Sequence, residues 1–267
     1  RGQLGVEVEP FEMLEMTQNA AVVPEEAIRE TVLQMKQRWV FDKPCDEAVL
    51  ETGARYALAV GKKIEERGYS AVTLIDVDGM KKLLGFPPAM VFMLLAERYG
   101  VLTVPENDVM GAVTQLIAKA ISGQIVPYLE YYEFFEKSML IGVPDYIPQS
   151  ATDGDIHVLP TAFGLLSQSL LNVSKVKTGL VTCLRLVYQD GRYGMHMYLA
   201  DAKTPANWEE CGWAPPAPQL PSLEVYPIDC TVAEFAEKVS SQHVIVCYGD
   251  HREAVQDFCK LTGIDLL

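Results

Sequence analysis

The sequence predicts an α/β, Rossmann-like domain with a parallel sheet, followed by a mainly antiparallel, β barrel-like domain. The first 150 residues alternate segments of helical apolar spacing with short apolar runs, which is the order of βαβ units. This order then stops, and two long strand-like runs flank an Asp-Gly pair that is typical of a hairpin. A length of 267 residues suits two domains. We therefore expect the Rossmann-like domain at residues 1–150 and the barrel-like domain at residues 151–267.

Helix ends in the first half carry capping residues. Pro24 comes directly before Glu25 and Glu26, a combination that favours the first turn of a helix. Three further segments have helical apolar spacing and end at or near a glycine that can cap them: residues 47–67, 89–98 and 109–122.

Short apolar runs between these helices predict strands. Residues 70–77 and 101–104 are rich in β-branched and aliphatic side chains, and a further strand is expected from residue 125. Because a helical crossover joins parallel strands, we expect 70–77 and 101–104 to be neighbours in a parallel sheet.

The second half is dominated by a hairpin signal. Asp190-Gly191 separates two strand-like runs, so we expect Leu180–Tyr188 to pair antiparallel with Tyr193–Ala200. Helices over 232–239 and 253–261 and a strand over 243–249 complete this half.

Composition restricts the partners and the compartment. The chain has 36 acidic and 22 basic residues, a net charge of −14, which disfavours nucleic acid and anionic membrane surfaces. No apolar run reaches the ~18 residues of a membrane span, and no signal-peptide pattern is visible. The six cysteines are far apart and form no CxxC, which favours free thiols in a reducing cytoplasm. Since the chain starts with Arg1 rather than Met, we expect a fragment of a longer protein.

Two carboxylates lie where a parallel sheet binds ligands. Glu106 and Asp108 follow Pro105, which ends the 101–104 strand, and a helix begins directly after them. Ligands of open α/β sheets bind at the carboxyl ends of the strands, so both acids are candidates for chemistry. The structural alternative is that Asp108 caps the helix and Glu106 is simply solvated.

Other polar candidates are more ambiguous. Asp76 and Asp78 alternate at the end of the preceding strand, so both can face one cleft, but an Asx turn explains them somewhat better. His243 stands directly before an apolar strand, although a single histidine is more often packed than a ligand. The run YLEYYEFFE at 128–136 combines rings and carboxylates that suit a sugar, and packing at a sheet edge explains it equally. GxGxxG, GxxxxGK[ST] and GxSxG motifs are absent from the sequence.

Taken together, these segments resemble the L-fucose/L-arabinose isomerase family. The resemblance covers nearly the whole chain and rests on LIDVDGMKKLLG, ERYGVLTVPENDVMGAVTQLIAKAISG, PYLEYYEFFEKSMLIGVP, GLVTCLRLVYQDGRYGMHMYLADA and SSQHVIVCYGDHREAVQDFCKLTGIDLL, which occur in the family's order. The combination of PEND with QH…YGDH is its most informative part. The resemblance implies that residues 1–150 are the middle domain, residues 151–267 are the C-terminal domain, and the family's N-terminal domain is absent.

The resemblance also implies a site. His243 matches the family's histidine metal ligand, and the PEND loop supplies a carboxylate from Glu106 or Asp108, as ligand or as catalytic base. Asp76, Asp78 and Gln242 are the expected sugar-binding residues. The family's first carboxylate has no clear match, and Asp76 and Asp78 lie next to its expected position.

The implied activity is aldose–ketose isomerisation through an enediol, an intramolecular oxidoreduction. The expected cofactor is Mn²⁺, with Mg²⁺ or Co²⁺ as substitutes, and the expected assembly is a homo-oligomer, a trimer or hexamer. Because the family's first domain is missing, we expect this chain alone to turn over poorly. The alternative function is a non-catalytic sugar-binding or assembly relative with a degenerate metal site.

Overall fold

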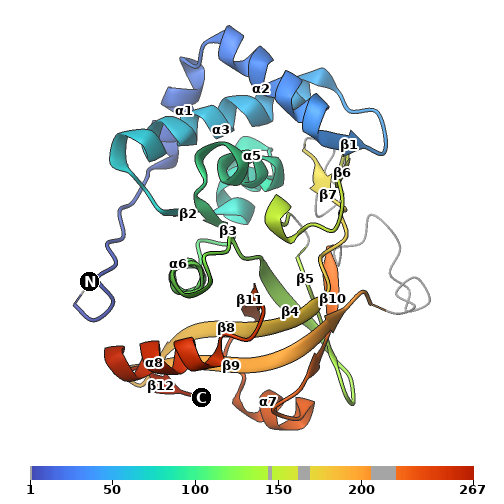
Figure 1. Cartoon of the computed structure of the whole chain (residues 1–267). Coiled ribbons are helices and arrows are strands. Elements are labelled where there is room, and N and C mark those ends of the chain that lie inside the picture. Colours follow the sequence, from blue (N-terminus) through green and yellow to red (C-terminus); the bar gives the residue numbers. More distant parts are fainter. Residues whose placement is uncertain (1, 144–145, 162–168, 206–220) are drawn as a thin grey trace.

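The computed structural model describes residues 2–143, 146–161, 169–205 and 221–267. Helices α1, α2, α3 and α5 lie at one end of the molecule, a β-barrel lies at the other, and α6 with strands β2 and β3 lies between them (Figure 1). The described helices are α1 (Met13–Ala21), α2 (Glu25–Arg38), α3 (Glu47–Arg67), α4 (Lys82–Leu84), α5 (Ala89–Tyr99), α6 (Val109–Ser122), α7 (Val232–Lys238) and α8 (Arg252–Thr262). A π-helical turn covers Asp76–Lys81, and a 3₁₀ turn covers Gln149–Ala151.

The strands fall into three sheets. The described strands are β1 (Trp39–Phe41), β2 (Ala71–Thr73), β3 (Leu102–Val104), β4 (Tyr128–Phe134), β5 (Met139–Gly142), β6 (Ile156–Leu159), β7 (Leu171–Asn172), β8 (Gly179–Gln189), β9 (Arg192–Lys203), β10 (Ser222–Pro227), β11 (His243–Tyr248) and β12 (Asp265–Leu266). The largest sheet forms the barrel, β2 and β3 form a pair, and β1, β6 and β7 form a third sheet.

Six strands close into an antiparallel barrel. Their order is β10-β5-β4-β11-β8-β9, and β9 pairs with β10 to close the ring. The hairpin of β8 and β9 has the predicted register, with Tyr188 opposite Tyr193 and Val181 opposite Ala200. The predicted antiparallel, barrel-like unit is therefore confirmed.

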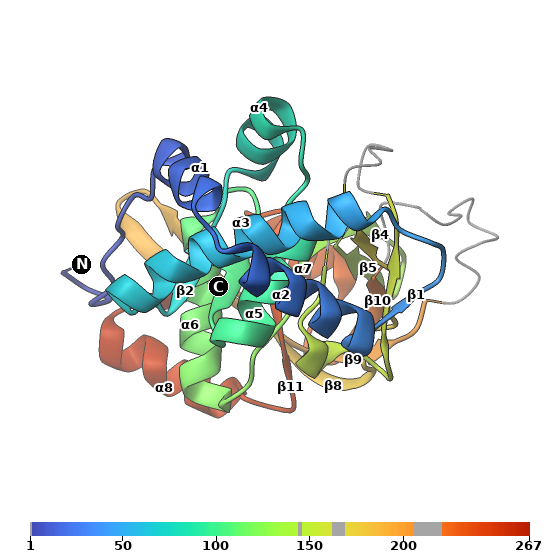
Figure 2. The same ribbon diagram turned by 90° about the horizontal axis from the view of Figure 1, so that it is seen from above.

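Side chains along the barrel strands alternate between two apolar clusters. Val181 and Cys183 of β8 belong to a cluster with residues from all six strands, so this cluster fills the barrel interior. Leu184 and Leu186 of the same strand face the opposite way and pack with residues of α6 and α8. Helix α6 therefore lies against the outer wall of the barrel, as the view from above also indicates (Figure 2). This packing brings the loop before α6 to the barrel.

The parallel sheet of the first half is smaller than predicted. Strands β2 and β3 pair in parallel, with Ala71 opposite Leu102, so the predicted neighbours are confirmed. Strand β2 ends at Thr73, the π-helical turn Asp76–Lys81 follows it, and no third described strand joins the pair. The strand expected from residue 125 begins instead at Tyr128 and belongs to the barrel. A two-stranded pair does not by itself establish a Rossmann-like domain.

The strand pairings also do not change at residue 150. Strands β4 and β5 precede that residue but are part of the barrel, whereas β6 follows it and pairs in parallel with β1. Order along the chain predicts neighbours well when strands are consecutive, but it cannot reveal pairings between distant strands.

The predicted helix ends are confirmed. Helix α2 begins directly after Pro24, and α3, α5 and α6 end at Gly68, Gly100 and Gly123 in the left-handed region, with φ of 67°, 64° and 70°. Among the described residues no single helix is both long and apolar enough to cross a membrane; the strongly bent pair Asp76–Leu84 and Ala89–Tyr99 meets the length and composition test when taken together.

The five described cysteines are free thiols, and Cys211 lies outside the described residues. Three of the five, Cys183, Cys247 and Cys259, are buried. Burial raises the pKa of Cys183 to about 12 and that of Cys247 to about 11, so both stay protonated at neutral pH.

Candidate metal centre

Strand pairing brings Glu130 next to His243. In the antiparallel pair of β4 and β11, His243 lies directly opposite Glu130. Side chains of directly opposed residues emerge on the same face of a sheet, with their Cβ atoms about 5 Å apart. Tyr128, two residues before Glu130 on β4, shares this face, and its ring stacks on the His243 imidazole with a centroid distance of 4.7 Å.

The loop between β3 and α6 brings Glu106 to the same place. Glu106 and Asn107 have positive φ values of 62° and 57°, which are rare for residues other than glycine. Two hydrogen bonds hold this loop: the Glu106 amide donates to Asp76 Oδ1 at 3.1 Å, and the Asn107 amide donates to the Leu74 carbonyl at 3.0 Å. Strained backbone that is anchored in this way is typical of functional sites.

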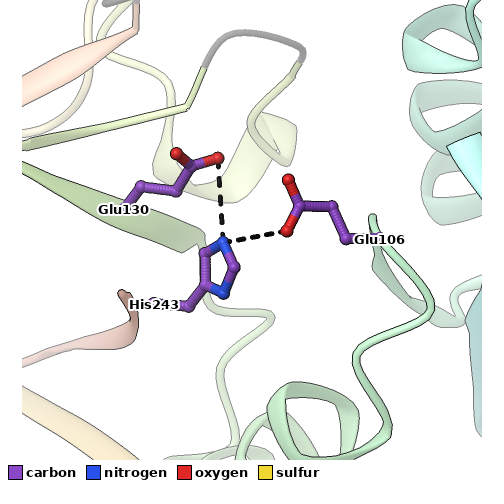
Figure 3. A group of neighbouring side chains, drawn as sticks. All are labelled: Glu106, Glu130 and His243. Carbon is purple, nitrogen blue, oxygen red and sulfur yellow. Dashed lines mark ion pairs between the residues drawn. The ribbon is translucent and has the colours of Figure 1, made fainter. Parts of the chain in front are cut away.

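The two glutamates converge on one nitrogen of His243. Nε2 lies 3.2 Å from Glu106 Oε2 and 3.8 Å from Glu130 Oε1 (Figure 3). The three side chains come from the β3–α6 loop, β4 and β11 and can each offer one ligand atom within 4.8 Å of the others. Nε2 is buried, and its contacts with the two glutamates are ion pairs that do not have hydrogen-bond geometry.

The charges of this group favour an ionised histidine. Burial by itself lowers the pKa of His243, but the contacts with Glu106 and Glu130 outweigh it and raise the pKa to about 9. The same contact with His243 lowers the pKa of Glu106, against the raising effect of burial. The side chain of Glu106 is 44% exposed, whereas that of Glu130 is 10% exposed, so Glu106 is the carboxylate that a solute can reach.

Asp108 is paired with Arg185 rather than facing the centre, contrary to its predicted roles as metal ligand and catalytic acid or base. Its Oδ2 accepts hydrogen bonds from Arg185 at 2.5 Å and from the Tyr128 hydroxyl at 2.8 Å. Its Oδ1 accepts from the Gly111 amide at 2.8 Å and from Arg185 at 3.1 Å. Four hydrogen bonds already hold this carboxylate, and the charge of the Arg185 guanidinium repels a cation. The predicted helix-capping alternative is confirmed, because Asp108 is the N-cap of α6.

The three predicted sugar-binding residues differ in burial and in their distance from the centre. Asp76 is buried and holds the Glu106 amide, and burial raises its pKa. Asp78 is 75% exposed and pairs with Lys82 one helical turn away, so the structure does not bring it to the centre. Gln242 donates through Nε2 to Glu130 Oε2 at 2.9 Å, which places it at the edge of the centre.

Glu130 is the member that sequence reasoning did not assign to the centre. It appeared only within the aromatic and acidic run at 128–136. The signal that identifies it is its position directly opposite His243, and this register depends on the closure of the barrel. Strand pairing across more than a hundred residues has no counterpart in local sequence patterns.

A scan of protein-family models finds no match, and a search of the curated proteins finds none. The assignment of a function therefore depends on the geometry of this centre.

That geometry fits a divalent cation. The donor set consists of two carboxylates and one imidazole, and hard divalent ions such as Mn²⁺ bind carboxylate oxygen readily and imidazole nitrogen as well. Nε2 of His243 has ion-pair contacts with both carboxylates and no hydrogen bond.

The tight packing around Asp108 yields a first prediction. A Cβ atom at Gly111 would lie 2.6 Å from Tyr128 Cε2 and 2.7 Å from Asp108 Oδ2. Gly111→Ala should therefore lower the free energy of unfolding by about 1–3 kcal/mol, as overpacking does elsewhere. Urea unfolding of the metal-free protein measures the loss. Gly2→Ala is the matched control, because a Cβ atom there has no neighbour within 4 Å. Equal stabilities of the two variants would contradict the described packing.

Proposed function

We propose that the chain is a divalent-metal-dependent aldose–ketose isomerase whose metal is held by Glu106, Glu130 and His243. The observation that carries this proposal is the convergence of the two carboxylates on Nε2 of His243. Glu130 supplies a carboxylate that the resemblance to the L-fucose/L-arabinose isomerase family requires and that the sequence did not locate. Mn²⁺ is the preferred ion, with Mg²⁺ or Co²⁺ as substitutes.

The proposed reaction moves one hydrogen from C2 to C1 of an aldose and one from O2 to O1. A divalent cation at this centre would supply Lewis-acid polarisation of the sugar's carbonyl and neighbouring hydroxyl oxygens. Glu106 is the candidate base, because it is the carboxylate of the centre that a substrate can reach. Its Oε2 faces His243, which leaves Oε1 to accept the C2 proton and return it at C1.

Other parts of the proposal follow from the family resemblance. The proposal includes a Rossmann-like character of residues 1–150 and a cytoplasmic location. It also includes a homo-oligomer in which a neighbouring subunit lies beside the site. Closure of the site by further protein would exclude water, which competes with the sugar for the metal.

A sugar panel tests the proposal. The protein, stripped of metal and then supplied with Mn²⁺, is assayed for aldose–ketose conversion of pentoses and 6-deoxyhexoses. We expect slow conversion of at least one sugar, and a chelator should abolish it. Glu130→Gln should reduce the rate on the order of 100-fold, because loss of a metal ligand removes both the ion and the alignment of the sugar that the ion provides. Glu133→Gln, an exposed glutamate on the same strand, should leave the rate unchanged.

The comparison between variants makes a low rate informative. Conversion equal in the protein and in Glu130→Gln would exclude the proposed centre from the reaction. Mn²⁺ binding without conversion of any sugar would overturn the isomerase proposal and favour the non-catalytic sugar-binding or assembly relative.

A further inference from the structure

The second nitrogen of His243 also faces a carboxylate. Nδ1 lies 3.7 Å from Asp108 Oδ2, on the other side of the ring from Glu106 and Glu130. This distance is longer than a hydrogen bond, so the present contact is electrostatic. Contacts of this kind in ligand-free sites commonly shorten when the site is filled.

Asp108 is fixed in place. Arg185 binds it through both terminal nitrogens, the Tyr128 hydroxyl binds Oδ2, and the Gly111 amide binds Oδ1. The Arg185 guanidinium pairs with the charge of this carboxylate. Its side chain is 13% exposed, and that of Arg185 is 11% exposed.

The His243 ring is fixed as well. The Tyr128 ring stacks on it with an interplanar angle of 29°, while the Tyr128 hydroxyl reaches Asp108. One side chain therefore sets both the plane of the imidazole and the position of the carboxylate beside Nδ1.

We infer that Asp108 is a positioning residue that accepts the Nδ1–H of His243 and thereby aims Nε2 at the point shared by Glu106 and Glu130. The inference deepens the proposed function and rests on it. When a cation occupies the Nε2 side, the ring proton can reside only on Nδ1, and Asp108 is the acceptor on that side. A carboxylate behind a ligating imidazole fixes its orientation and increases its basicity.

Arg185 completes this role. Its charge offsets that of Asp108, so the carboxylate orients the imidazole without itself becoming a ligand. The structure thus separates carboxylates that face the ion position, Glu106 and Glu130, from one that faces the back of the histidine.

Metal affinity and the Nδ1 proton test this inference. In calorimetric titrations with Mn²⁺ alone, Asp108→Asn should bind about 10–100-fold more weakly than the unchanged protein, the range for loss of such a partner. The matched control is Asp250→Asn, because Asp250 also pairs with an arginine, Arg252, but at an exposed position. Its Mn²⁺ affinity should be unchanged.

If Asp108→Asn does not fold, a measurement on the unchanged protein tests the same role of Asp108. With ¹⁵N-labelled histidine and diamagnetic Zn²⁺ as the probe, His243 should show an Nδ1–H proton that exchanges with water much more slowly than the ring protons of half-exposed His157.

The outcomes separate the inference from the proposed function. Unchanged affinity in Asp108→Asn, or fast exchange at Nδ1 in the metal-loaded protein, would overturn the positioning role alone. Absence of Mn²⁺ binding to the unchanged protein would overturn the metal centre and this role together.

Discussion

Replacing His243 by alanine should weaken Mn²⁺ binding more than 100-fold. The substitution removes Nε2, the atom on which both glutamates converge, and leaves the centre without its imidazole ligand. Loss of a partner behind a metal ligand costs about 10–100-fold in affinity, so loss of the ligand itself should cost more than about 100-fold. Calorimetric titration of the metal-stripped protein measures the change.

Two further variants distinguish the loss of a metal ligand from unfolding of the protein. His243→Gln keeps a polar side chain of comparable length and should lose the affinity as well. His157→Ala removes a half-exposed histidine that pairs with Asp42 on the β1 side and should bind Mn²⁺ normally. Normal Mn²⁺ affinity in His243→Ala would place any metal elsewhere in the protein.

Saturating Mn²⁺ should stabilise the protein, and Glu130 should be necessary for that effect. At a free Mn²⁺ concentration about 100 times Kd, binding to the folded state alone adds about 2.7 kcal/mol, or about 5–10 °C in the unfolding midpoint for a chain of this size. Glu130→Gln keeps the shape of the side chain but removes its charge, so the midpoint should no longer rise with Mn²⁺. Thermal unfolding followed by circular dichroism measures both proteins.

Glu133→Gln is the control for this substitution, because it removes the same charge from an exposed position on β4. Its midpoint should rise with Mn²⁺ as in the unchanged protein. A rise of equal size in Glu130→Gln would show that Glu130 is not a ligand.

Local sequence patterns predicted the parts of the fold that depend on interactions between residues close together in the chain. The caps at Pro24, Gly68 and Gly123 and the Asp190-Gly191 hairpin depend on residues that are neighbours in the chain. The strand from residue 125 was placed in the wrong sheet, because an apolar run signals a strand but not its partner. That partner is determined by the closure of the barrel.

The same division applies to the site. Glu106 was predicted from its position at the end of a strand and His243 from the family resemblance, and the structure brings them within 3.2 Å of each other. Glu130 could not be assigned, because its role depends on the register between β4 and β11. Asp108 was predicted as a ligand, but the sequence gives no sign that Arg185, 77 residues away, occupies its oxygens.

Anomalous diffraction from a crystal soaked in Mn²⁺ and measured near the manganese absorption edge tests the metal centre most directly. We expect one strong anomalous peak within coordination distance of Glu106, Glu130 and Nε2 of His243, and none beside Asp108. A crystal that contains Mn²⁺ elsewhere, or no Mn²⁺, while His243 remains in direct ion pairs with the two glutamates would contradict it.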